Sequence, residues 1–190
     1  MDAVERLWAS FVALGPFKLI AEQMSVVDFD EAAKQTPHSP DLRKLFEVLG
    51  SNTPNPATMA DAKNEQPFVS PLAWAYFSSY QATVVGAFAR LKILQSGIRD
   101  SGKLLKKTFA LDLLKTSLPE HTEYIEKHGA TKSLLEELEK RLLAELTKIL
   151  EGADIDAASV ARSAEIMTAV EKATSERDKQ LTDAGVKPAQ

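Results

Sequence analysis

Residues 70–97 read SPLAWAYFSSYQATVVGAFARLKILQSG. Serine followed by proline is a typical helix start, with serine as N-cap and proline at the first helical position, and a glycine commonly follows a helix C-terminus. Between these signals, large apolar side chains cover much of the helix circumference: Trp74, Phe77, Tyr80, Val84, Val85, Phe88, Leu91 and Leu94. A helix that is apolar all round is buried. The stretch therefore predicts a central helix at about residues 72–96, around which the rest of the chain packs.

The sequence on both sides of this stretch also has helical character. Apolar residues recur at helical spacing through residues 2–14, 17–24, 41–49 and 103–114, and again from 133 to 174, whereas alternating strand patterns and Asn-Gly or Asp-Gly hairpin turns are missing. We therefore predict an all-α, single-domain bundle of about seven or eight helices around the central apolar helix.

The polar stretches divide the chain into parts. Residues 51–69 contain three prolines and several Asn, Ser and Thr residues, which predicts a long loop. Apolar residues almost vanish after residue 174. We therefore expect one helical domain at residues 1–174 and a polar, frayed end at residues 175–190.

Local start signals predict where several of these helices begin. Asp28, Ser39 and Asp156 are candidate N-caps, and Ser39 is followed by Pro40. The helix after Ser39 has apolar residues at helical spacing: Leu42, Leu45, Phe46 and Leu49. Ser117 and Ser133 each precede a glutamate by three residues, as in a capping box, so we also expect helices to start there.

The composition excludes most catalytic chemistry. The chain has 190 residues, no cysteine, three histidines and a net charge of −4, so disulfides, thiolate metal sites and a cysteine nucleophile are ruled out. Glycine-rich phosphate loops and the G-x-S-x-G elbow are also missing. His121 and His128 lie near Glu120 and Glu123, but their spacing matches no metal motif. We predict no metal, no cofactor, no catalytic residues and no enzyme activity.

Basic residues are concentrated in one segment of this acidic chain. Residues 90–115 carry seven basic and two acidic side chains, a net charge of +5. Within it, a group of four cations is a candidate patch for an anion or a partner: Arg99, Lys103, Lys106 and Lys107. The alternative is a solvated face balanced by the acidic helices of the same fold. The net acidic chain and the lack of interleaved aromatic residues argue against nucleic-acid binding.

Aromatic residues are concentrated on the central helix. They either line an apolar pocket between helices or form the core: Trp74, Tyr76, Phe77, Tyr80 and Phe88. Small residues on the same helix predict faces for close helix approach: Ala75, Ser79, Ala82 and Gly86.

These features favour a non-enzymatic interaction protein. We expect a cytoplasmic adaptor, regulator or assembly subunit that self-associates or binds a protein partner, through the leucine stripe of residues 134–150 or through the N-terminal helix. The alternative is a membrane-active or lipid-binding protein that exposes residues 68–89 and the N-terminal helix on activation. Residues 68–89 carry no charge over 22 positions, although several Ser, Thr and Gln residues interrupt them.

Overall fold

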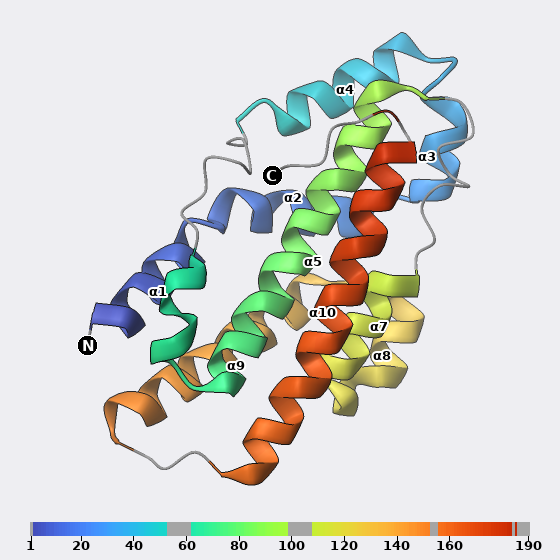
Figure 1. Cartoon of the computed structure of the whole chain (residues 1–190). Helices are drawn as coiled ribbons and strands as arrows, with labels where there is room; N and C mark the ends of the chain where they lie inside the picture. The colour runs from blue at the N-terminus through green and yellow to red at the C-terminus, as the bar shows by residue number, and fades with distance from the viewer. Residues whose placement is uncertain (1, 53–61, 99–107, 153–155, 184, 186–190) are drawn as a thin grey trace.

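Helix α5, Pro71–Ser96, runs through the middle of the bundle, as the computed structural model shows (Figure 1). The structure describes residues 2–52, 62–98, 108–152, 156–183 and 185. Sixteen of the 26 residues of α5 are buried. The helix contacts α2, α3, α4, α7, α9 and α10, so it is the central helix that the sequence predicts.

The described residues form an all-helical, single compact domain of nine α-helices and two 3-10 helices. This count is close to the seven or eight helices predicted. The elements are α1 (Asp2–Val12), α2 (Gly15–Ser25), α3 (Phe29–Gln35), α4 (Pro40–Gly50), η2 (Ala62–Phe68), α5, α7 (Thr108–Ser117), η3 (Pro119–His121), α8 (Thr122–His128), α9 (Lys132–Leu150) and α10 (Ala157–Asp183).

Helices α5 and α10 lie side by side and run in the same direction (Figure 1). Two parallel neighbours require a long connection, and here the chain between them forms α7, α8 and α9. Helix α9 packs its leucines against α5, and α2 covers another side of it. The core is therefore one continuous cluster that draws on nearly every helix.

The ends of α5 are set by the residues that the sequence indicates. Ser70 Oγ accepts a hydrogen bond from the backbone N–H of Ala73 at 3.1 Å, and Pro71 is the first helical residue. Gly97 ends the helix in the left-handed conformation, with φ of +61°. A Cβ there would lie 2.6 Å from Cδ of Arg43, whose guanidinium donates to the carbonyl of Thr36 at 2.8 Å. Glycine suits this position because of its positive φ, and a larger residue would also displace the Arg43 side chain.

A buried pair of hydroxyls joins α5 to α7. Oγ of Ser79 lies 2.6 Å from Oγ of Ser117, and both side chains are fully buried. Ser117 donates its single proton to the carbonyl of Leu113 at 2.9 Å, so Ser79 is the donor within the pair. The small side chain of Ser79 thus lets α7 approach closely, as the sequence predicts.

The two predicted capping boxes are wrong. Ser117 is the last residue of α7, and its hydroxyl bonds to Ser79 and Leu113 instead of capping the next element, η3, which begins at Pro119. Helix α9 begins at Lys132, one residue before Ser133, and Ser133 Oγ lies 2.9 Å from Oγ1 of Thr131. By contrast, Asp28, Ser39 and Asp156 each accept a backbone N–H at the predicted helix starts.

The predicted loop and the predicted frayed end also need correction. Within the loop predicted at 51–69, η2 packs on α1 and buries Glu65, whose carboxylate pairs with Arg6 at 2.8 Å; residues 53–61 lie outside the described residues. Helix α10 does not fray at residue 175 but continues to Asp183, because Gln180 and Leu181 are buried against the bundle. Residues 184 and 186–190 lie outside the described part.

The cap of α5 gives a first prediction. Ser70→Ala removes the acceptor for the Ala73 N–H and should lower the free energy of unfolding by about 1 kcal/mol, as N-cap substitutions do. Urea unfolding followed by circular dichroism measures this. The matched control is Ser175→Ala, an exposed position inside α10, which should leave stability almost unchanged. Equal effects of the two substitutions would contradict the capping role.

The serine pair gives a second prediction. Ser117→Ala leaves the buried hydroxyl of Ser79 without its acceptor and should cost about 1–3 kcal/mol. The double substitution Ser79→Ala/Ser117→Ala should cost less than the sum of the two single ones, because it removes both partners. A double-mutant cycle of urea unfolding checks this, and strict additivity would show that the two hydroxyls are not coupled.

Candidate functional site

The five predicted aromatic residues lie in the core. Each is at most 8% exposed, and they pack on the N-terminal helices: the ring of Tyr80 lies 4.5 Å from that of Phe11, and Phe88 meets Phe17 edge-on at 5.3 Å. The others are Trp74, Tyr76 and Phe77. Burial raises the pKa of the Tyr80 phenol well above its ordinary value, and the charges of Glu139 and Glu22 add to this. Tyr80 therefore stays protonated and has no acid–base role near neutral pH.

The sequence predicts partner surfaces on α9 and α1, but most apolar side chains of these two helices are buried in the core. The leucine stripe of α9 is buried against α5: Leu134, Leu135, Leu138, Leu142 and Leu146. On α1, Leu7 and Phe11 are likewise buried. Only isolated apolar side chains remain outside on these helices, such as Leu143 and Leu150 on α9.

The two other regions that the sequence singles out are the basic patch and the uncharged stretch. Arg99, Lys103, Lys106 and Lys107 lie outside the described residues. The uncharged stretch of residues 68–89 is mostly α5, so contact with lipid would require this helix to leave the core. Among the helices in the described part of the chain, none combines the length and the apolar character that crossing a bilayer requires.

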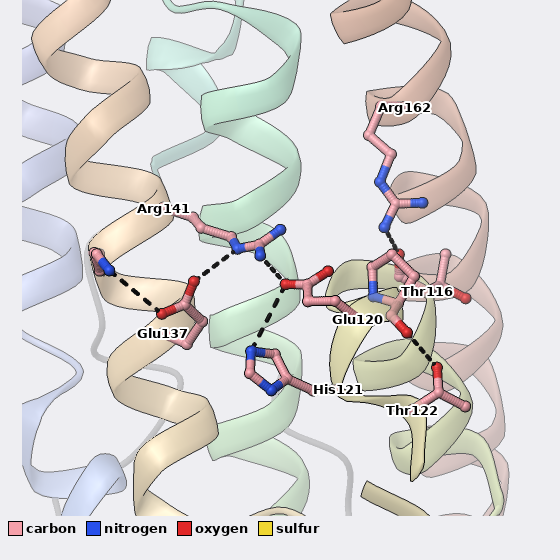
Figure 2. Close-up of polar contacts among 9 residues, drawn as sticks. Thr116, Glu120, His121, Thr122, Glu137, Arg141 and Arg162 are labelled. Atoms are coloured by element: carbon pink, nitrogen blue, oxygen red, sulfur yellow. Dashed lines mark hydrogen bonds and ion pairs between the residues drawn. The ribbon is translucent and has the colours of Figure 1, made fainter. Parts of the chain in front are cut away.

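A polar network links η3 to α9 (Figure 2). Arg141 on α9 donates from Nε to Glu137 at 3.1 Å, one helical turn earlier, and from Nη2 to Glu120 on η3. Nε2 of His121 lies 3.7 Å from the same oxygen of Glu120. The guanidinium carbon of Arg141 is also 6.0 Å from the ring centroid of Tyr76. The network therefore ties η3 to α9, next to Tyr76 on α5.

Two carboxylates and a histidine in this network have the chemistry of metal ligands. Ligand atoms of Glu120, His121 and Glu137 lie within 4.8 Å of one another. However, the guanidinium of Arg141 bonds to both carboxylates, and a metal ion would have to displace it. The arrangement is a neutralised ion-pair network rather than an open coordination site. Sequence reasoning missed Glu137 because it is 16 positions away from His121, on another helix.

Within the described residues, no serine or threonine hydroxyl bonds to His38, His121 or His128, whereas nucleophilic catalysis by a hydroxyl relies on such a base. His128 is instead the last residue of α8 and lies 4.6 Å from the ring of Tyr124.

The outer face of helix α4 exposes two apolar side chains among charged ones (Asp41, Lys44 and Glu47). Its inner face buries Phe46 and Gly50 against α5, and Nε2 of Gln95 on α5 donates to the carbonyl of Phe46 at 2.8 Å. On the outer face, Leu45 is 54% exposed and Val48 is 64% exposed. Of the apolar residues that the sequence shows at helical spacing on this helix, Phe46 is buried and Leu45 is exposed.

No protein-family model, curated protein or solved structure matches this chain.

The network around Arg141 gives a third prediction. Arg141→Met keeps the length of the side chain but leaves Glu120 and Glu137 without their shared cation. Because these groups are partly exposed, the loss of unfolding free energy should stay below about 1 kcal/mol at physiological salt. It should shrink further as NaCl rises from 0.01 to 1 M, since salt screens the remaining repulsion.

Urea unfolding at several salt concentrations measures this effect. Lys132→Met is the control, because it removes a single exposed contact of 3.7 Å to Glu136. A large cost of Arg141→Met that is independent of salt would show that Arg141 acts by packing on Tyr76 instead.

Proposed function

We propose that this protein is a non-enzymatic, cytoplasmic interaction protein, an adaptor, regulator or assembly subunit, and that it self-associates through the outer face of α4. The observation that supports this is the exposed pair Leu45 and Val48, three positions apart on one face of a helix. Apolar side chains at this spacing are the anchors that helices use at protein interfaces.

The position of α4 in the fold suits this role. Its chief contact is with α5, and it lies at one end of the bundle, with its outer side away from the other helices (Figure 1). The inner anchors Phe46 and Gly50 hold the helix rigidly, so association requires little ordering of the backbone. The absence of cysteine agrees with a reducing compartment.

The organisation of the polar groups supports a non-enzymatic role. The carboxylates beside His121 are bonded to Arg141, and the buried phenol of Tyr80 remains protonated. Catalytic acids and bases instead need titratable groups that change their proton occupancy near the working pH.

The α4 surface gives a fourth prediction. A face of one 11-residue helix is small, so we expect self-association with Kd in the micromolar to millimolar range. Light scattering after size-exclusion chromatography, at 5 and 500 μM protein, should show a rise in mean mass with concentration. Leu45→Glu/Val48→Glu should abolish that rise, because it places charges in the contact.

The matched control is Leu150→Glu, which changes a leucine of similar exposure, 60%, on α9. It should leave the concentration dependence intact. All these positions are exposed, so the melting temperatures should remain close to that of the wild type. A wild-type chain that is monomeric at both concentrations, or equal effects of the two variants, would overturn the proposal.

A further inference from the structure

A cavity of about 330 Å³ opens beside the second half of α5, next to the end of α10. Helices α2, α3, α7 and α8 complete its wall. The wall is largely apolar and includes Met24, Phe29, Ala89, Leu111, Leu113 and Leu181. Its size is at the lower end of the range for small-molecule sites, about 300–1,000 Å³.

Small residues on α5 create this space. Ala82, Gly86 and Ala89 follow one another at helical spacing and all line the cavity. A Cβ added at Gly86 would meet nothing within 4 Å, so no neighbouring helix fills the position. The sequence predicts close helix approach at Gly86, but the structure leaves a hollow there.

Arg90 brings a positive charge into this apolar wall. It follows Gly86 by one helical turn, is half-buried and lines the cavity. Its guanidinium carbon is 5.9 Å from the ring centroid of Phe29. Within the described part of the chain, the guanidinium makes no hydrogen bond and no ion pair.

The donors of Arg90 are thus available for a ligand. Burial lowers the pKa of Arg90, and the nearby charge of Asp30 opposes this shift; an arginine nevertheless stays charged at any physiological pH. A partly desolvated guanidinium without an acceptor is unfavourable, and its planar fork matches the two oxygens of a carboxylate.

Two of the four remaining charges at the cavity are in ion pairs. Arg177 bonds to Asp178 at 2.6 Å and Glu126 bonds to Lys115 at 2.8 Å. The side chains that line the cavity include three cations (Arg90, Lys127 and Arg177) and two anions (Glu126 and Glu176), a net charge of +1.

We propose that this cavity binds a small monocarboxylate with an apolar body, the carboxylate against Arg90 and the body against Phe29, Met24 and the open face of Gly86. A cavity of about 150 Å³ holds benzene, so about 330 Å³ holds a ligand of about a dozen non-hydrogen atoms. A medium-chain fatty acid has this size and this chemistry. The site is independent of the association proposed for α4.

Isothermal titration calorimetry of the full chain with decanoate tests this proposal. Decanoate should bind with a stoichiometry of one. Decyltrimethylammonium, which has the same chain but the opposite charge, should bind at least tenfold more weakly. No heat of binding with decanoate up to 1 mM, or equal affinity for the two amphiphiles, would overturn the proposal.

Three variants locate the binding. Arg90→Gln should weaken decanoate binding at least tenfold, whereas Lys92→Gln, a cation on the same helix that does not line the cavity, should leave it unchanged. Gly86→Leu should abolish binding by filling the hollow. Leucine has a higher helix propensity than glycine, and the space at Gly86 is open, so we expect Gly86→Leu to fold. It therefore tests the site even if Arg90→Gln fails to fold. Decanoate binding that survives Gly86→Leu would place the ligand elsewhere and contradict the inference.

Discussion

Helix α5 is apolar around nearly its whole circumference. Whichever way it is turned, other helices must therefore cover it on every side. The rest of the fold follows from this constraint. Helices α2, α4, α7, α9 and α10 each turn apolar side chains toward α5, and together they surround it. Trp74, Phe77 and Tyr80 anchor one half of α5 in this sheath. The other half ends at Gly97, whose positive φ favours glycine and which lies against the side chain of Arg43.

The fold class could be predicted because its strongest signals are local. Ser70, Pro71 and Gly97 define the ends of α5, and Asp28, Ser39 and Asp156 cap other helices as expected. The failures came where a distant partner decided the outcome. The hydroxyl of Ser117 bonds to Ser79, 38 positions away, and so Ser117 does not cap the next helical element, which begins at Pro119. In the same way, Leu181 keeps the end of α10 helical through contacts that its polar neighbours do not reveal.

The candidate site was harder to predict, for two physical reasons. An apolar stripe shows that a helix is covered, but not by what; the leucines of α9 are covered by α5 of the same chain, whereas Leu45 on α4 is not covered. A glycine on a helix is equally consistent with close packing and with a hollow, and Gly86 proved to be the second case. Arg90 was counted with the basic segment of residues 90–115, although its guanidinium faces a cavity rather than open solvent.

The parallel pairing of α5 with α10 has a consequence for the synthesis of the protein on the ribosome. Asp183, the end of α10, follows the end of α5 by about 87 residues, and translation at about 5–20 residues per second needs about 4–17 s to make them. Throughout that interval the most apolar helix of the chain lacks the helix that covers one of its sides. The apolar side of α5 that α10 covers in the folded protein therefore stays without this cover until the last helix has been made.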